Sequence, residues 1–316
     1  MSNYDVVIIG GGAAGLSAAL VLARARRTVA VVDAGEPRNL AAAHMNGFLS
    51  RDGMPPRELL AAGRAEVDGY GGHLLNGRVE RVRRTPDGFD VLLSDREPRT
   101  ARRVLVATGL HDHLPDLPGV RERWGRDLLH CPYCHGHEVR DLPLGVLGGS
   151  PEAVQHAQLV RQWSPDVVLF SDLEEIDADA REQLVARAIG IVDGRVKRLV
   201  VAANRLTGLE LEDGRFVPRA AVFVRPRFVP QTDLLADLGC LADDQGWIVT
   251  DPVGRTSQPG VWAAGNATNP RAQVITAAGE GSAAAIALNA DLVDEDVRNA
   301  VRDFRGGLTE IGASRR

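Results

Sequence analysis

The sequence of 316 residues has few cysteines, and three in this length exclude a disulfide scaffold. It also lacks a basic surplus, because 37 lysines and arginines against 42 aspartates and glutamates give a formal net charge of −5. Nucleic-acid binding needs a basic face, so we expect no nucleic-acid partner. We find neither an N-terminal secretion signal nor about 18 uninterrupted apolar residues, which predicts a cytoplasmic protein with no membrane contact.

The remaining composition is typical of a globular protein, with 44% hydrophobic and 25% charged residues. At about 150 residues per domain, the length predicts two domains. Short β-branched runs alternate with helical patterns, which indicates an α/β fold of two doubly wound, three-layer, Rossmann-like domains. We expect the last helix over residues 273–292, and the charged residues after it show no pattern.

A glycine-rich turn near the N-terminus carries a dinucleotide-binding pattern. A β-branched run ends at Gly10-x-Gly12-x-x-Gly15, which opens a helix, and Asp33 ends the next apolar run. Gly10 permits the tight turn, Gly12 lets the backbone approach a pyrophosphate, and Gly15 lets the helix pack on the strand. The helix N-terminus offers free N–H groups to phosphates, and Asp33 can accept hydrogen bonds from a ribose. We therefore predict a dinucleotide site, against the alternative of a merely glycine-rich turn.

Two of the three cysteines, Cys131 and Cys134, form a C-x-x-C motif. In a reducing compartment this spacing indicates redox or metal chemistry, and the proline between them suits the first turn of a helix, where thiol pKa values are lowered. With His135 the motif also matches c-type haem attachment, but no export signal accompanies it. Zinc could take both cysteines, His135 and His137, yet four ligands so close in sequence would strain a tetrahedral site. We expect a redox pair and no metal, with inert buried cysteines as the remaining alternative.

Two further segments resemble the thioredoxin reductase-like flavoproteins. Residues 104–109 (VLVATG) and 256–266 (TSQPGVWAAGN) are similar to the second and third FAD segments of that family. The resemblance implies two Rossmann-like domains of the thioredoxin reductase type, with the second inserted in the first. Asn266 stands where the family has a carboxylate that holds the ribityl chain, and its amide can still donate and accept hydrogen bonds.

The resemblance predicts FAD as the cofactor. It implies an FAD-binding domain formed by residues 1–114 and 243–316, and a degenerate NAD(P)-binding-like domain, residues 115–242, that carries the C-x-x-C. Together with the glycine motif it assigns the FAD contacts to Gly10, Gly12, Ala14, Gly15, Asp33, Asn46, Val79, Ala107, Thr108, Gly109, Gly265, Asn266, Gln273 and Val274.

The family also implies roles for the redox motif. In thioredoxin reductases the second cysteine faces the flavin, the first exchanges with substrate, and an acidic residue after the pair relays protons. By position, Cys134 is the flavin-proximal sulfur, Cys131 is the exchange thiol and His135 is the relay. An imidazole with a pKa near 6.5 can accept a thiol proton at neutral pH, which a carboxylate does poorly. Cys240 has no partner in the sequence, and we expect a small buried hydrophobe there.

The second domain departs from the family at its nucleotide site. Its turn reads Gly148-Gly149-Ser150, so a serine replaces the glycine that lets the backbone approach a pyrophosphate, and Glu152 adds a carboxylate to the first turn. The family's basic cluster for a 2′-phosphate is replaced by residues 171–175 (SDLEE). We infer that nicotinamide binding is lost or feeble, with a tolerant or NADH-using site as the alternative.

The string C-P-Y-C-H-G resembles the FAD-dependent dithiol oxidases that close disulfides in microbial natural products such as gliotoxin and holomycin. This resemblance implies a homodimer that oxidises a small-molecule dithiol with O₂ and releases H₂O₂. One alternative is a disulfide reductase supplied by NAD(P)H or another donor. Another is a non-catalytic flavin redox sensor.

Overall fold

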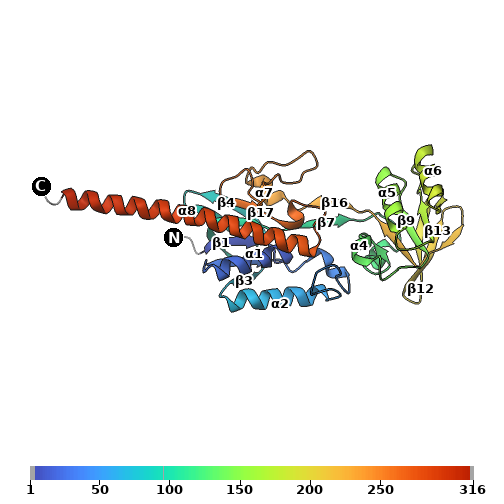
Figure 1. Ribbon diagram of the computed structural model, residues 1–316, viewed down its shortest axis with the longest axis horizontal. Helices are drawn as coiled ribbons and strands as arrows, with labels where there is room; N and C mark the ends of the chain where they lie inside the picture. The colour runs from blue at the N-terminus through green and yellow to red at the C-terminus, as the bar shows by residue number, and fades with distance from the viewer. Residues whose placement is uncertain (1–3, 95, 314–316) are drawn as a thin grey trace. The chain divides into compact units, whose positions relative to one another are not determined.

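The computed structural model describes residues 4–94 and 96–313 and divides the chain into two compact units (Figure 1). Each unit has its own parallel sheet, so the α/β fold with two Rossmann-like domains is confirmed. Unit 1 consists of Met1–Pro37, Glu58–His111 and Pro230–Arg316. Unit 2 consists of Arg38–Arg57 and Asp112–Val229.

The main sheet of unit 1 has the strand order β3-β2-β1-β6-β5-β4, and β17 pairs with β6. Strands β1, β2, β3, β6 and β17 pair in parallel, whereas β4, β5 and β6 form an antiparallel meander. The strands are β1 (Tyr4–Ile9), β2 (Val29–Asp33), β3 (His73–Asn76), β4 (Val79–Thr85), β5 (Gly88–Leu93), β6 (Arg96–Val106) and β17 (Val261–Ala263).

Helices cover one face of the parallel strands, and the hairpin of β4 and β5 packs against the other face. Alternate residues of β1 point to opposite faces: Ile8 packs with helices α1 and α8, whereas Ile9 packs with β4 and β5. Because both faces are buried, the central strands are continuous apolar runs instead of alternating ones. The helices of this unit are α1 (Ala13–Arg24), α2 (Pro56–Gly69), α7 (Asp233–Asp237), the 3₁₀ turn η2 (Gly265–Ala267) and α8 (Val274–Ala313).

The last helix is much longer than its sequence pattern predicts. The expected end at residue 292 is wrong, because α8 continues to Ala313 and runs past the sheet (Figure 1). Its first half packs beside α1, where Gly281 lies so close to the backbone of Ala14 that a side chain would not fit. Within residues 4–94 and 96–313, no helix combines the length and apolar content needed to cross a bilayer.

Unit 2 is built on a parallel sheet with the order β11-β10-β9-β15-β8, accompanied by an antiparallel sheet of β12, β13 and β14. The two-stranded pair of β7 and β16 contains two of the four boundaries between the units. The strands are β7 (Leu110–His113), β8 (Leu128–Leu129), β9 (Leu144–Leu147), β10 (Val167–Phe170), β11 (Ile189–Val192), β12 (Val196–Ala202), β13 (Arg205–Leu211), β14 (Phe216–Pro218), β15 (Ala221–Val224) and β16 (Arg227–Pro230). The helices are η1 (Arg38–Ala41), α3 (Val120–Arg123), α4 (Pro132–His135), α5 (Pro151–Val160) and α6 (Ala178–Ala186).

One segment packs with a different part of the chain than its sequence position suggests. Residues 38–57 belong to unit 2, although they lie within the predicted FAD-binding range of 1–114. Arg38 anchors the segment through two hydrogen bonds to the carboxylate of Asp112, at 2.7 and 2.8 Å. Compactness and ligand binding are different properties, so the assignment of FAD to residues 1–114 and 243–316 stays a prediction.

Candidate active site

Three of the predicted FAD segments meet at one edge of the unit 1 sheet. Backbone hydrogen bonds connect them: Ala107 N–H donates to the carbonyl of Ile9 at 2.7 Å, and Ala264 N–H donates to that of Val106 at 3.1 Å. The turn at Gly10 has a φ of 108°, and a side chain there would overlap the carbonyl of Ala107. The carboxyl ends of parallel strands, where these segments lie, form the usual ligand edge of an open α/β sheet.

The N-terminus of α1 is open to an anion. Gly12 is the N-cap residue and makes no side-chain capping hydrogen bond. A side chain built at Gly12 would meet no atom within 4 Å, so the space beside the first N–H groups is clear. Gly15, by contrast, is packed against Gly10. Free N–H groups beside an open space are what a diphosphate requires, so the residues present fit the predicted dinucleotide.

Most of the remaining residues assigned to FAD in unit 1 lie around this turn or at the start of α8. A side chain at Gly11 would come within 2.7 Å of the Asp33 carboxyl, which forms an ion pair with Arg64. A side chain built at Gly265, in the third segment, would come within 2.9 Å of the Ala14 side chain. The other positions are Val79 in the core beside β2, Thr108 and Gly109 after β6, and Gln273 and Val274 at the start of α8.

Asn266 stabilises the loop that carries it. Its Nδ2 donates to the carbonyl oxygens of Asn269 at 2.9 Å and Ala272 at 3.1 Å. The carboxylate of Glu280 on α8 accepts from Gly265 N–H at 3.0 Å and from Asn269 Nδ2 at 2.7 Å. Sequence reasoning missed Glu280, and its only signal is a carboxylate nearly two helical turns into an alanine-rich helix.

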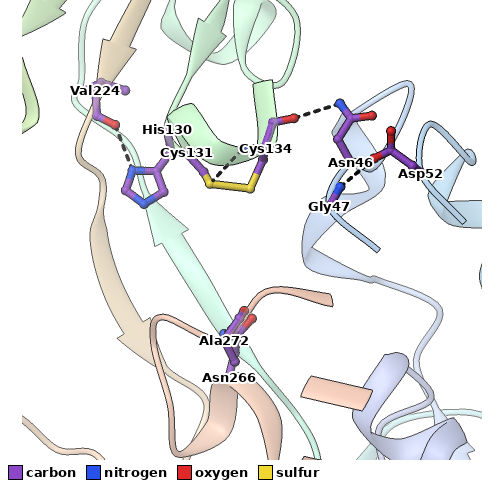
Figure 2. The surroundings of a disulfide bond; sticks show 9 residues. All are labelled: Asn46, Gly47, Asp52, His130, Cys131, Cys134, Val224, Asn266 and Ala272. Atoms are coloured by element: carbon purple, nitrogen blue, oxygen red, sulfur yellow. Dashed lines mark hydrogen bonds between the residues drawn. A yellow bond between two sulfur atoms is a disulfide. The ribbon is translucent and has the colours of Figure 1, made fainter. Parts of the chain in front are cut away.

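In unit 2, Cys131 and Cys134 form a disulfide, with their Cα atoms 5.2 Å apart (Figure 2). Cys131 is the N-cap of α4, and Pro132 begins that helix. The backbone N–H of Cys134 donates to Cys131 Sγ at 3.2 Å. A donor held at this sulfur favours its thiolate form once the disulfide is reduced.

Asn46 reaches the redox motif from the segment 38–57. Its Nδ2 donates to the carbonyl oxygen of Cys134 at 2.8 Å (Figure 2). The loop that presents Asn46 is itself closed by a hydrogen bond from Gly47 N–H to Asp52 Oδ1 at 2.8 Å. The sequence placed Asn46 among the FAD contacts, and the structure adds a direct contact with the backbone of the cysteine pair.

His135 follows the pair and is half-buried. Burial lowers its pKa below the ordinary value, and the nearby carboxylate of Glu138 partly opposes that shift. The imidazole is therefore neutral at pH 7, the form that accepts a proton.

Two further histidines, His130 before the cysteine pair and His156 on α5, pack together. Nδ1 of His130 carries the hydrogen, because it bonds the carbonyl oxygen of Val224 at 3.1 Å (Figure 2). The His130 ring packs edge-on against Phe228 and 5.9 Å from the ring of His156. Burial lowers the pKa of His130, and lowers that of His156 to about 4. At neutral pH neither histidine supplies a positive charge to the sulfurs.

The glycine turn of unit 2 is filled by the protein's own groups. Ser150 is the N-cap of α5, and its Oγ accepts from Ala153 N–H at 3.3 Å. The carboxylate of Glu174 accepts from Gly149 N–H at 2.6 Å. Glu152 lies in the first turn of the helix. The N–H groups that are free in α1 thus have internal acceptors in α5, and two carboxylates oppose an anion.

The third cysteine, Cys240, is a free thiol in the core of unit 1. Burial raises its pKa, and its Sγ lies 3.5 Å from Thr256 Oγ1. An inert thiol of this kind fits the expectation of a small buried hydrophobe.

A Rossmann-type sheet with an open dinucleotide turn, joined in one chain to a C-x-x-C disulfide, defines a thiol/disulfide oxidoreductase. The chain matches the family model for pyridine nucleotide-disulphide oxidoreductases over residues 4–281 and belongs to that family. Proteins of this thioredoxin reductase type bind FAD, and the chain is a flavoprotein enzyme, as the sequence predicted.

Individual relatives are similar over nearly the whole chain. Thioredoxin reductase sirT of Leptosphaeria maculans is 32% identical over 317 residues, covering 94% of this chain and 96% of that protein. The crystal structure of HlmI is 60% identical with a TM-score of 0.92, covering 95% of each chain. A putative thioredoxin reductase, TrxB of Bacillus anthracis, is 34% identical with a TM-score of 0.89, covering 93% of this chain and 99% of that one.

Proposed function

We propose that this protein is a dithiol oxidase, which converts a small-molecule dithiol and O₂ into an intramolecular disulfide and H₂O₂. The observation that carries the proposal is the contrast between the two glycine turns. The N-terminus of α1 is open at Gly12, whereas that of α5 is capped by Ser150 and opposed by Glu174. The first suits FAD and the second disfavours NADPH, so electrons must enter through the cysteine pair.

The exchange step uses the two sulfurs of the chain. A substrate thiolate attacks Cys131 Sγ, the bond to Cys134 breaks, and Cys134 leaves as a thiolate. The second substrate thiolate then attacks the substrate sulfur of the mixed disulfide. The substrate leaves as a disulfide, and Cys131 leaves as a thiolate. The donor from Cys134 N–H to Cys131 Sγ stabilises that leaving thiolate.

Protons from the substrate need an acceptor at the site. His135 is neutral at pH 7 because burial lowers its pKa, so it can take a proton from a substrate thiol. Bound FAD supplies the two-electron acceptor that restores the disulfide and passes the electrons to O₂. The residues that would hold it are those around Gly12, Asp33 and Asn266 in unit 1.

A reductase supplied by NADH is the second candidate, and one observation favours it. Glu174 lies against Gly149 much as Asp33 lies against Gly11 in unit 1. An acidic residue at this place accepts ribose hydroxyls in NAD-binding turns. Ser150 and Glu152 still oppose the pyrophosphate, which is why we prefer the oxidase.

We propose that the enzyme works as a homodimer in the cytoplasm. The support is a row of exposed apolar side chains on α8, opposite the face that packs on the sheet: Ile286, Val293, Val297, Val301 and Phe304. Spacings of three, four or seven residues place them on one face, as in a coiled-coil seam. Antiparallel pairing about Val297 would set the large Phe304 against the small Ala290 of a second copy.

Light scattering tests the dimer. Val297→Glu and Phe304→Glu should each halve the mass in solution. Val185→Glu makes the same change at an exposed valine of unit 2 and should leave the mass unchanged. A dimeric mass in both α8 variants would remove this surface from the proposal.

The oxidase itself is tested by turnover in air. Purified protein, supplied with dithiothreitol and no nicotinamide, should consume O₂ and release H₂O₂. Cys131→Ser and Cys134→Ser should each abolish turnover while the flavin stays bound. Turnover that requires NADH or NADPH would establish the reductase, and turnover under neither condition would favour the flavin redox sensor. The C-P-Y-C-H-G string supports a microbial natural product as the physiological dithiol.

A further inference from the structure

A cavity of about 610 Å³ lies within unit 2, beside the redox helix. Its volume is within the range of roughly 300 to 1,000 Å³ that is typical of small-molecule pockets. It is formed between the segment 38–57 and the region around α4. The lining residues include Leu40, Ala42, Ala43, Pro55, Leu129 and Val139, together with several polar side chains.

The segment 38–57 is a fixed wall of this cavity. Arg38 is held by Asp112, and its guanidinium also lies over the ring of Phe228, 4.8 Å from the ring centre. Ala41 lies so close to Gly125 that a side chain at position 125 would come within 3.0 Å of it. Gly125 also has a φ of 75°, which favours glycine. The wall is thus anchored at its start, before Asn46 reaches the cysteine pair.

The opposite wall connects the cavity with the sulfur chemistry. His135, the proton acceptor of the proposed exchange, lines the cavity together with Glu138 and Val139. Asn46 lines it from the other side and donates to the carbonyl oxygen of Cys134. A molecule in the cavity therefore lies against the residue that follows the disulfide, close to the base that would take its proton.

The lining selects by polarity and charge. Most of its side chains are alanine, leucine, proline or valine, which favour an apolar molecule and leave room for its bulk. Arg57 and Arg126 outnumber the carboxylate of Glu138, so the lining carries a positive surplus. Such a lining disfavours a cationic ligand and accepts a neutral or anionic one.

We propose that this cavity is the binding pocket for the dithiol, and that it selects a compact, largely apolar, neutral or anionic substrate. This inference rests on the proposed dithiol oxidation. The pocket makes the alanines at positions 42 and 43 specificity-determining residues, because larger side chains there would fill the space that the substrate body needs.

Enlarging Ala43 tests the pocket, with toluene-3,4-dithiol as an apolar probe and dithiothreitol as a small polar one. Ala43 is exposed, so Ala43→Trp fills the cavity without disturbing a core, and Ala43→Leu fills it partly. Ala186→Trp is the matched control, because Ala186 is exposed on α6 away from the cavity. In Ala43→Trp the kcat/KM for toluene-3,4-dithiol should fall relative to dithiothreitol by about tenfold, which corresponds to about 1.4 kcal/mol. Ala43→Leu should give a smaller fall, and Ala186→Trp none.

Binding without turnover separates this inference from the proposed function. In a Cys131→Ser, Cys134→Ser background, calorimetry should show that Ala43→Trp weakens toluene-3,4-dithiol binding by a similar factor. Unchanged affinity and an unchanged kcat/KM ratio in Ala43→Trp would overturn the pocket even if the enzyme is an oxidase. If Ala43→Trp weakens affinity in this background but the wild-type protein oxidises neither dithiol, the pocket is supported and the oxidase is overturned.

Discussion

The carboxylate of Glu174 accepts a hydrogen bond from the backbone N–H of Gly149, with 2.6 Å between oxygen and nitrogen. In unit 1 the carboxylate beside the glycine turn, Asp33, is paired with Arg64 instead. The protein thus places a negative charge on an N–H group of the turn that a nicotinamide dinucleotide would use. This contact, with the Ser150 cap, gives a physical reason for the low nicotinamide affinity that the sequence predicts.

Nicotinamide dinucleotides should therefore be poor reductants of the wild-type flavin. NADH and NADPH at about 1 mM, the upper end of ordinary Michaelis constants, should not bleach it on the timescale of dithiol turnover. Ser150→Gly combined with Glu174→Gln removes the cap and the charge, and should raise NADPH affinity several-fold in a fluorescence titration. Rapid bleaching of the wild-type protein by either dinucleotide would contradict this view of the turn.

His135→Ala should slow flavin reduction by a dithiol by about 10²-fold at pH 7, the usual order for loss of a general base. Burial lowers the pKa of His135, so its imidazole is protonated, and lost as a base, only when the pH falls below that lowered pKa. The difference between wild type and His135→Ala should therefore be present at pH 7. Stopped-flow absorbance at several pH values measures this. His137→Ala is the control, because His137 is exposed near the same helix. Matching pH–rate profiles for wild type and His135→Ala would remove His135 from the exchange step.

Asn266→Asp should weaken FAD binding, although it introduces the carboxylate that the family resemblance implies at this position. The amide donates to two carbonyl oxygens, and a carboxylate would face both as an acceptor. Losing two hydrogen bonds at about 1 kcal/mol each should raise the FAD dissociation constant about tenfold or more. Asn299→Asp on α8 controls for the added charge. Tighter FAD binding in Asn266→Asp would show that the family carboxylate acts directly on the cofactor here.

His156→Phe should remove an acid-dependent loss of stability. The folded protein holds the pKa of His156 at about 4, below the ordinary value of about 6.5 in the unfolded chain. Protons therefore bind the unfolded state preferentially, so stability falls as the pH drops from about 6.5 to 4, by up to roughly 3 kcal/mol. Urea unfolding at pH 7 and pH 4.5 should show a smaller acid loss in His156→Phe than in wild type. Equal losses in the two proteins would contradict the burial effect.

Local patterns were sufficient to predict much of the fold. The β-branched run before Gly10 is β1, the helix that the glycine turn opens is α1, and the apolar run that ends at Asp33 is β2. The predicted glycine turn of the second domain likewise lies between a strand, β9, and a helix, α5. These elements are specified by short-range periodicity and turn chemistry, which are properties of neighbouring residues.

Long-range contacts account for what the sequence did not indicate. The segment 38–57 joins unit 2 through Arg38 with Asp112 and Asn46 with Cys134, pairs separated by 74 and 88 positions. Glu174 and Glu280 accept hydrogen bonds from the backbone of Gly149 and Gly265, which lie 25 and 15 positions away in the sequence. The extension of α8 was missed because its apolar face is narrow and interrupted by charges, and such a pattern resembles a solvated end.

Anaerobic reduction tests the central claim most directly. When dithiothreitol is mixed with the oxidised protein without oxygen or nicotinamide, the yellow flavin absorbance should bleach. Admission of air should then restore the absorbance and release an equivalent amount of H₂O₂, and Cys134→Ser should block the bleaching. A flavin that stays oxidised with the dithiol but is reduced by NADH or NADPH would contradict the account.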